Sequence, residues 1–418
     1  MAVTSRTFLF TRRSLVQGAA AATAGTAVAT ALPRRSYGFQ DAVTLTWWDY
    51  YQDANEAAVL KQFDAYKAAT GVTIERQYFA FADLKQRLLQ GATASQLPDV
   101  VIIDNPDHQS FAALGVFADI TDRLTAWGQT ANFFEGPLNS TIWQDKHYGL
   151  PDNSNCIVLW TNDELLSAAG VTPPTNWDEL KATATALSSP GKYGLAMSGV
   201  RSEEGTFQFL PFLWETGADL ATFDSDGGRA ALQLWVDLVA DRSMSQGILG
   251  WTQGDVCGQF QNGLAAMMVN GPWQIPRLAE ESPDLKWSVA TLPAQAQGAS
   301  VLGGENMALT AASKNLDAAW DFMAWRNDPV NLKQYLVDAG KLPSRSDLAE
   351  DPTWTGDPVL SIFVEQLKVA KPRAYGDKYP EMSAAIQTAM QSTVSGQTDV
   401  ASAATTAQAV ITPLLPPS

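Results

Sequence analysis

The sequence predicts an α/β fold, because segments typical of strands alternate with segments typical of helices along much of its 418 residues. Residues 42–48 (AVTLTWW) are rich in β-branched and aromatic side chains. Residues 100–103 (VVII) form the continuous apolar run expected of a strand buried on both faces of a parallel sheet. Between them, residues 53–70 carry apolar side chains at helical spacing and precede Gly71, a common helix stop. The length predicts two to three domains of about 150 residues each.

The first strands and helices are expected in a doubly wound order. A second strand at 72–78 and a second helix at 82–90, ended by Gly91, complete a strand–helix–strand–helix–strand unit. In such sheets, ligands bind beyond the carboxyl ends of the strands. The middle third continues the pattern, with strands expected at 157–160, 265–269 and 287–292, and helices at 163–169, 177–187, 227–241, 255–262 and 316–327.

The composition excludes several classes of protein. The chain has 28 Lys+Arg against 44 Asp+Glu, a net charge of −16, whereas a nucleic-acid binder needs a basic face. Two His and two Cys are too few for most zinc sites. We therefore expect no nucleic-acid partner, no metal, no cofactor and no catalytic residue. Cys156 and Cys257 are interpreted as buried thiols or, alternatively, as one disulfide, which export would permit.

The first 31 residues are interpreted as a twin-arginine signal peptide. Arg12 and Arg13 lie in a charged region, an uncharged Ala/Gly/Thr run follows at 18–32, and residues 29–31 fit a small-residue cleavage site. The paired arginines favour the twin-arginine export route, so we expect a periplasmic protein. No Cys ends the run, so no lipid anchor is expected.

Five short segments carry motifs in a fixed order. They are 143–162 (WQDKHYGLPDNSNCIVLWTN), 209–220 (FLPFLWETGADL), 260–273 (FQNGLAAMMVNGPW), 302–310 (LGGENMALT) and 340–345 (GKLPSR). Together they resemble the bacterial extracellular solute-binding proteins of carbohydrate ABC importers, the maltose-binding-protein-like family 1. Each motif alone is weak, but the set spans nearly the whole chain that follows the signal peptide.

The resemblance implies a two-lobe periplasmic-binding-protein fold that closes on a ligand. Each lobe would be a mainly parallel sheet flanked by helices, and three hinge crossings would fall near 151–155, 301–306 and 342–344. The resemblance places residues 41–152 plus 306–341 in the first lobe and residues 153–305 plus 342–418 in the second. It also implies a monomer that captures a mono- or oligosaccharide and delivers it to the transmembrane subunits of an ABC permease.

Three tryptophans are candidates for stacking on a sugar. A sugar presents apolar C–H faces and a rim of hydroxyls, so its binder needs flat aromatic rings together with carboxylate or amide groups. Trp48, Trp214 and Trp273 each lie in a motif at an expected strand end or turn. Trp273 follows Gly271 and Pro272 in a rigid turn and is the clearest candidate, with a core-capping role as the alternative. For Trp48, the alternation leaves open which ring of the Trp47–Trp48 pair faces the core.

The polar candidates near the first sheet follow strands. Asp104 and Asn105 end the expected strand at 100–103, where they either contact the ligand or cap the next helix. Asp49 follows the first strand, and a turn role is its alternative.

The other polar candidates lie on the crossings or in the second lobe that the resemblance implies. Asn155 lies on the first crossing, and Gly304 and Glu305 lie on the second, where glycine lets the backbone approach a ligand closely. Asp219 follows the glycine of the LWETGAD segment. Arg345 either binds ligand hydroxyls or pairs with Glu305.

Aromatic rings and carboxylates also suit two other classes of protein. A secreted glycoside hydrolase would hold two carboxyl groups about 5–10 Å apart. Against it, the sequence carries no G-x-S-x-G, P-loop or H-E-x-x-H motif. A polyamine-type cation-binding protein of an ABC importer would use the same residue types. Acidic and amide candidates outnumber basic ones, which suits a neutral polyol better than an anion.

Overall fold

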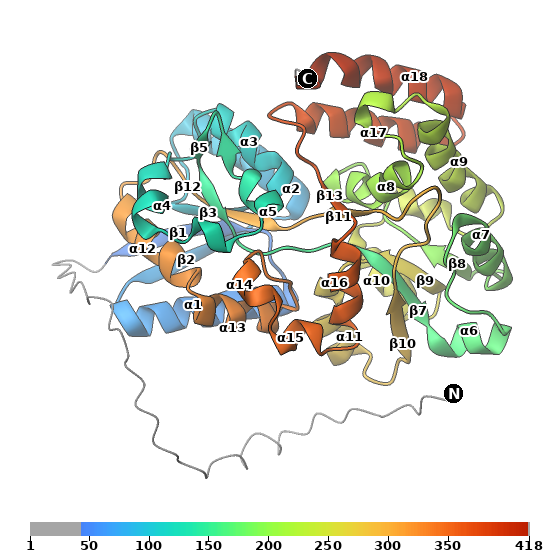
Figure 1. Cartoon of the computed structure of the whole chain (residues 1–418), viewed down its shortest axis with the longest axis horizontal. Coiled ribbons are helices and arrows are strands. Elements are labelled where there is room, and N and C mark those ends of the chain that lie inside the picture. Colours follow the sequence, from blue (N-terminus) through green and yellow to red (C-terminus); the bar gives the residue numbers. More distant parts are fainter. Residues whose placement is uncertain (1–42, 417–418) are drawn as a thin grey trace, which may run out of the picture. The chain divides into compact units, whose positions relative to one another are not determined.

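The computed structural model describes residues 43–416, so the predicted signal peptide lies outside the described residues (Figure 1). Two sheets organise the described chain, one with the strand order β2-β1-β3-β12-β6 and the other with the order β10-β7-β9-β8. The first sheet contains β1 (Thr44–Asp49), β2 (Thr73–Tyr78), β3 (Val100–Asp104), β6 (Gly149–Pro151) and β12 (Glu305–Leu309). The second contains β7 (Val158–Asn162), β8 (Tyr193–Ala196), β9 (Ala265–Asn270) and β10 (Trp287–Ala290). Two smaller pairs are β4 (Ile142–Trp143) with β5 (Lys146–His147), and β11 (Ser300–Leu302) with β13 (Ala370–Pro372).

The α/β class is confirmed, but the strand directions differ from the expectation of mainly parallel sheets. In the first sheet β1 is parallel to β2 and β3, whereas β12 is antiparallel to β3 and β6. In the second sheet only the pair β8–β9 is parallel, because β7 runs antiparallel to β9 and β10. β7 and β12 enter their sheets from segments that come from the other sheet. No crossover helix therefore imposes the parallel direction on them.

The strand β3 is buried on both faces, as its continuous apolar run predicts. Val100 and Ile102 face a core that contains Trp47, whereas Val101 and Ile103 face a separate core that contains Phe111. This alternation follows from the two-residue period of a strand. Both cysteines, Cys156 and Cys257, are buried free thiols rather than a disulfide.

Seven helices of the described chain lie near the first sheet; those at 53–70 and 316–326 match predicted helices, the one at 81–94 matches in part, and the other four were not predicted. They are α1 (Asp53–Thr70), α2 (Phe81–Ala94), α3 (Asn105–Ala113), α4 (Thr121–Trp127), α5 (Glu135–Asn139), α12 (Leu316–Arg326) and α13 (Pro329–Ala339). The predicted stop at Gly91 is wrong, because α2 continues to Ala94 and ends at Ser95 in the left-handed conformation. A Cβ on Gly91 would lie 2.8 Å from the carbonyl oxygen of Gln96. This glycine therefore serves the close approach of the following chain.

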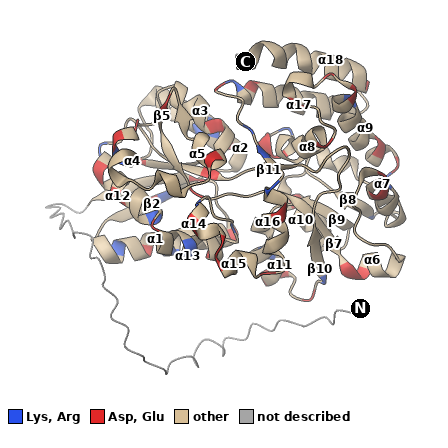
Figure 2. Cartoon of the chain, viewed as in Figure 1, with Lys and Arg blue, Asp and Glu red and all other residues tan. Residues whose placement is uncertain are grey.

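The remaining helices lie mainly around the second sheet. They are α6 (Asp163–Ala169), α7 (Trp177–Ala186), α8 (Glu203–Glu215), α9 (Asp226–Ala240), α10 (Gln253–Gln261), α11 (Ile275–Glu281), α14 (Ser346–Ala349), α15 (Pro352–Thr355), α16 (Leu360–Leu367), α17 (Tyr379–Val394) and α18 (Val400–Ile411). Acidic side chains occur on helices around both sheets, for example on α4, α6 and α9 (Figure 2). Across residues 43–416, none of the helices combines the length and the apolar character needed to cross a bilayer.

The chain passes between the two sheets along segments that are bonded to one another. β6 of the first sheet is followed directly by β7 of the second, and the chain returns from β10 through β11 to β12. The segment between these sheets pairs with two later ones, because Ser154 bridges Leu342 and Asn155 bridges Gly303. Backbone hydrogen bonds of 2.9–3.3 Å join the partners of each bridge. Three stretches far apart in sequence therefore lie side by side at this junction.

Candidate functional site

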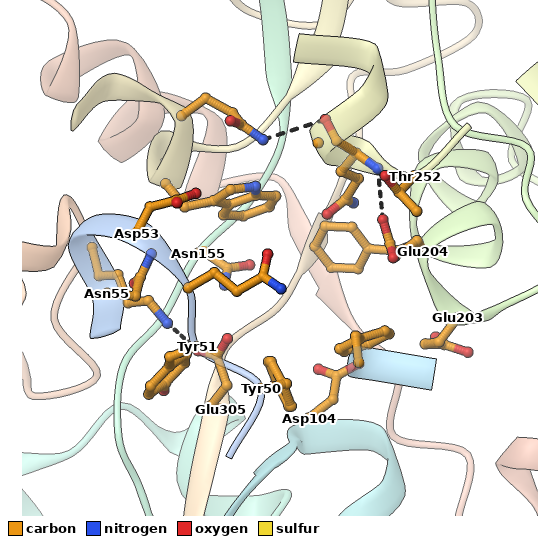
Figure 3. Close-up of a pocket in the computed structure, with 18 of the residues that line it drawn as sticks. Tyr50, Tyr51, Asp53, Asn55, Asp104, Asn155, Glu203, Glu204, Thr252 and Glu305 are labelled. Atoms are coloured by element: carbon orange, nitrogen blue, oxygen red, sulfur yellow. Dashed lines mark hydrogen bonds and ion pairs between the residues drawn. The ribbon is translucent and has the colours of Figure 1, made fainter. Parts of the chain in front are cut away.

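A pocket of about 370 Å³ lies between elements of the two sheets. It is bordered by Tyr50 and Tyr51, just beyond the carboxyl end of β1, and by Asp104, the last residue of β3, at the edge where the doubly wound order predicted a ligand. Figure 3 shows Tyr50, Tyr51, Asp104, Asn155 and Glu305 around this cavity. On the side of the second sheet, the lining comes from the start of α8, the start of α10, the turn after β9 and α11. These residues are Glu203, Glu204, Phe207, Thr252, Gln253, Gly254, Trp273, Gln274 and Arg277. Its volume is at the small end of the range for small-molecule sites, about 300–1,000 Å³.

Aromatic rings line both sides of the pocket. Tyr50, Tyr51 and Phe81 come from the side of the first sheet, and Phe207 and Trp273 come from the other. The ring centroids of Phe207 and Trp273 are 6.4 Å apart. These rings supply flat apolar faces of the kind that pack against C–H groups.

Gly271 fixes the position of the Trp273 ring. Trp273 lies in the 3₁₀ turn Pro272–Gln274, directly after β9. A Cβ on Gly271 would lie 2.0 Å from the ring of Trp273, so the indole packs directly on the glycine backbone. The ring is partly exposed and lines the pocket, as the GPW motif led us to expect.

A buried arginine holds two carboxylates at one end of the pocket. Arg373 Nη1 donates to Asp104 Oδ2 at 3.0 Å and to Glu203 Oε1 at 2.7 Å. Its Nη2 donates to Asp104 Oδ1 and to Asn105 Oδ1, each at 3.0 Å. The guanidinium also lies 4.7 Å from the centroid of the Phe207 ring. Asp104 is the last residue of β3 in the first sheet, and Glu203 begins α8 beside the second sheet, so this cluster joins parts of the chain near both sheets.

The cluster has strongly perturbed protonation equilibria. Burial raises the pKa of Asp104 to about 7, although Arg373 opposes this shift. Burial by itself lowers the pKa of Arg373, but Asp104 and Glu203 more than compensate, and the net pKa lies above its ordinary value. The arginine therefore stays charged, and its charge is already neutralised within the protein.

A second buried cation at the pocket also has its own partner. Lys341 Nζ lies 2.8 Å from Glu305 Oε2 and 4.2 Å from the centroid of the Tyr51 ring. The side chain of Lys341 is 3% exposed. The Tyr51 hydroxyl donates a hydrogen bond to Asp152. Burial, together with the nearby carboxylates of Asp152 and Glu305, raises the pKa of Tyr51 well above its ordinary value. Neither buried cation is therefore free to bind an anionic ligand.

Asn155 lines the pocket and carries a buried acceptor without a partner among the described residues. The residue is 6% exposed, and its backbone exchanges hydrogen bonds of 2.9–3.0 Å with Gly303. Its Oδ1 atom is buried and has no hydrogen-bond partner within the described chain. A buried amide oxygen without a donor costs about 1–3 kcal/mol, so a ligand that donates a hydrogen bond here regains that free energy.

Two glycines allow this close packing at the second crossing. A Cβ on Gly303 would lie 2.2 Å from Asn155 Oδ1. Gly304 has φ +138°, and a Cβ there would lie 2.2 Å from the carbonyl oxygen of Asn153. A larger residue would displace the Asn155 side chain at position 303 and the Asn153 backbone at position 304.

Five of the residues predicted from sequence lie in the pocket lining: Asp104, Asn155, Trp273, Gly304 and Glu305. Asn105 lies just outside it, where it accepts a hydrogen bond from Arg373. Asp104 is the last residue of β3 and Asn105 is the first residue of α3, and Arg373 donates hydrogen bonds to both side chains. The alternative in which Glu305 pairs with Arg345 is wrong, because Glu305 pairs with Lys341.

Two of the predicted aromatic residues lie outside the pocket lining. Trp214 is fully buried on α8, in the core beside the second sheet. Trp48 packs against Phe79 with ring centroids 4.9 Å apart, on the face of the first sheet opposite to Trp47. Both rings are therefore used in packing.

Three predicted polar residues also lie outside the lining, because each has partners within the protein. Asp49 is fully buried and accepts hydrogen bonds from Arg76 and from the Trp47 indole. Asp219 caps the 3₁₀ turn Leu220–Thr222 and accepts a hydrogen bond from a tyrosine hydroxyl. Arg345 is fully buried and pairs with Asp347 at 2.7 Å.

Several lining residues escaped prediction. Lys341 lies inside the GKLPSR segment, so the motif could have identified it as a lining residue. Arg373 lies after β13, in a segment without a recognised motif. Glu204 accepts the backbone N–H of Gln253 at 2.6 Å, so it caps α10 from another helix, a contact that no local pattern reveals. Within residues 43–416, no three His, Cys, Asp or Glu side chains are grouped as a metal site requires.

Comparison with known proteins shows which family the chain resembles. Residues 61–361 match the family model described as bacterial extracellular solute-binding protein. A putative binding protein of Brucella abortus strain 2308 is 26% identical over 350 residues, covering 81% of this chain and 84% of the relative. The structure of an ABC transporter solute-binding protein from Thermotoga lettingae, bound with α-D-tagatose, has a TM-score of 0.85 and 26% identity, covering 90% of this chain and 100% of that chain. Maltose-bound MalE3 of T. maritima has a TM-score of 0.82 and 25% identity, with the same coverage.

Proposed function

We propose that this chain, which belongs to the family of bacterial extracellular solute-binding proteins, is the sugar-capturing component of an ABC importer. The ligand is a mono- or oligosaccharide that is handed to the transmembrane subunits of a permease. Related structures that cover the same fold hold tagatose in one protein and maltose in another, which supports a carbohydrate ligand.

The observation that carries this proposal is the pairing of aromatic rings with neutralised polar groups in one pocket. Trp273 and Phe207 offer apolar faces, and Asn155 Oδ1 offers an acceptor without a partner. A sugar hydroxyl donates to such an acceptor while its ring packs on the aromatic side chains. Lys341 and Arg373 already have carboxylate partners, so the pocket favours a neutral ligand over an anion.

The lobes that close on the sugar are proposed to be residues 41–152 plus 306–341 and residues 153–305 plus 342–418. The two sheets fall in different parts of this division. The bonded junction at Asn155, Gly303 and Leu342 supports a hinge, because rotation about a few short segments moves each part as a rigid body.

We further propose that the protein works as a periplasmic monomer. It is proposed to be exported by the twin-arginine route and, since no Cys ends the uncharged run at 18–32, to diffuse to the permease without a lipid anchor. The twin-arginine stretch at Arg12–Arg13 supports this route. Fusion of residues 1–41 to a reporter tests it: export should require the twin-arginine translocase, and export in a translocase-deficient strain would contradict the proposal.

Binding without turnover is the central property to test. Purified protein is screened by thermal shift against glucose, maltose, maltotriose, mannose, tagatose, ribitol, galacturonate and spermidine. A bound ligand at 100 times its dissociation constant adds ~2.7 kcal/mol to the stability of the folded state. We expect a neutral sugar or polyol to raise the melting temperature. Stabilisation by spermidine alone would contradict a sugar ligand.

Chromatography of the bound sugar distinguishes a binding protein from a hydrolase. We expect the oligosaccharides to be recovered intact after overnight incubation. Cleavage at a rate proportional to protein concentration would favour a secreted glycoside hydrolase instead.

A further inference from the structure

We propose that Arg373 closes one end of the sugar pocket and thereby limits the length of the ligand. This inference rests on the proposed function, since it concerns which sugars the same pocket accepts. Arg373 would then be a specificity-determining residue, although it lies outside every motif found in the sequence.

The first argument is that Arg373 lies between two hollows. It lines the 370 Å³ pocket, and it also lines a second hollow of about 10 Å³. Its hydrogen-bond partners divide in the same way: Asp104 borders the large pocket and Asn105 borders the small hollow. The small hollow has room for about one water molecule. The guanidinium is therefore the partition between a ligand-sized space and a hollow of about the size of one water molecule.

The second argument is that this partition is held firmly. Arg373 is 4% exposed, and its two terminal nitrogens make four hydrogen bonds of 2.7–3.0 Å. Glu203, one of the acceptors, also accepts a hydrogen bond of 2.6 Å from the hydroxyl of Tyr379. Displacing the arginine would leave Asp104 and Glu203 buried without their cation, which is costly. A ligand cannot push this side chain aside at low cost.

The third argument is the difference between the two ends of the pocket. Figure 3 shows Asp53 and Thr252 toward one end and Asp104 and Glu203 toward the other. Asp53 and Thr252 are exposed, whereas Asp104 and Glu203 are buried. The pocket is thus open to solvent at the first end and closed at the Arg373 end. A longer sugar can extend only toward Asp53 and Thr252.

The test removes the partition and one of its two carboxylate partners; the other, Glu203, keeps the hydroxyls of Tyr379 and Ser383 as hydrogen-bond donors. The full chain carrying Arg373→Ser together with Asp104→Asn is compared with the unchanged protein. Two further variants accompany it. Arg373→Lys keeps the charge and most of the side-chain length. Arg345→Gln removes another fully buried arginine with an acidic partner, one that does not line the pocket.

The probes are two series of increasing length, glucose to maltotetraose and mannose to mannotetraose, titrated by calorimetry. In the unchanged protein, affinity should fall at least tenfold from the preferred length to the next longer sugar. In Arg373→Ser with Asp104→Asn, the preferred length should increase by one unit. Arg373→Lys and Arg345→Gln should keep the original order. The same order in the Ser/Asn variant and the unchanged protein would overturn the inference while leaving sugar binding intact.

A second measurement does not depend on the folding of any variant. In a crystal structure of the unchanged protein with its preferred sugar, the ligand should end against Arg373 and leave the hollow beside Gln109 and Ser140 empty of sugar. A sugar that ends short of Arg373, or that extends past it, would overturn the inference. Failure of the unchanged protein to bind any sugar or polyol would instead overturn the proposed function, and this inference with it.

Discussion

Lys341 Nζ and Glu305 Oε2 lie 2.8 Å apart and join two segments of the chain that run between the sheets. Glu305 is the first residue of β12, and Lys341 directly follows the left-handed Gly340 that ends α13. Both residues line the pocket. The ion pair therefore links the ligand site to the junction about which we propose that the lobes rotate.

Breaking this pair should destabilise the protein. Lys341→Met leaves Glu305 with 12% side-chain exposure and no cation, and removal of one partner of a buried pair costs about 3–5 kcal/mol. Urea unfolding of Lys341→Met, Glu305→Gln and the double variant measures the effect. The double variant should be more stable than Lys341→Met alone. If the double variant lost as much unfolding free energy as the two single variants together, the two side chains would not be coupled.

Trp273→Ala should weaken sugar binding at least tenfold, about 1.4 kcal/mol. The ring packs on Gly271 beside the pocket, so its removal deletes an apolar face without opening the core. Trp127→Ala is the matched control, because Trp127 is also a partly buried tryptophan but does not line the pocket. Calorimetric titration should show the loss in the first variant only. Equal affinities in both variants would remove Trp273 from the site.

Gly304→Ala should prevent stable folding or abolish binding, because φ is +138° and the new methyl group would meet the Asn153 carbonyl oxygen. Gly298→Ala is the control on the segment that leads into the same crossing. A Cβ there meets nothing within 4 Å, and its backbone is not left-handed. Soluble yield and melting temperature should fall sharply for the first variant and stay near the original for the second. A well-folded, sugar-binding Gly304→Ala protein would contradict the tight junction.

His108 should make the protein less stable in acid. The residue is fully buried, and burial lowers its pKa to about 3 from an ordinary value near 6.5. The unfolded chain therefore binds a proton at His108 between about pH 6.5 and 3 that the folded protein does not. Stability is lost as pH falls through this window.

In His108→Leu, the decline of unfolding free energy from pH 7 to pH 4 should be shallower than in the unchanged protein. Guanidinium unfolding at each pH measures it. Burial also lowers the pKa of His147, but this residue is less buried than His108. His147→Leu should therefore have a smaller effect on the pH profile. Parallel pH profiles for His108→Leu and the unchanged protein would show that the buried imidazole has no such effect.

The elements that local chemistry specifies could be predicted from the sequence. α1 was predicted with its exact bounds at 53–70, because its apolar positions share one face and Gly71 adopts the left-handed conformation that ends it. β3 was predicted from four consecutive apolar residues, which reflect a core on each face. In contrast, Gly91 looked like a helix stop, although its role is set by the chain that later passes over it.

The site was predicted only in part, because much of it depends on contacts between distant residues. Asn155, Gly304 and Glu305 were found through motifs on the crossings. Trp214 was assigned to the site, but α8 is buried on nearly all its faces, and no polar stripe shows which ring points inward. Arg373 was missed because its role depends on its hydrogen bonds with Asp104, which is 269 residues away in the sequence.

The most direct test of the central claim is a crystal structure of the protein with the sugar that stabilises it best. The account predicts a sugar ring packed on Trp273, with one hydroxyl donating to Asn155 Oδ1. A sugar bound elsewhere, or one that contacts neither residue, would contradict it.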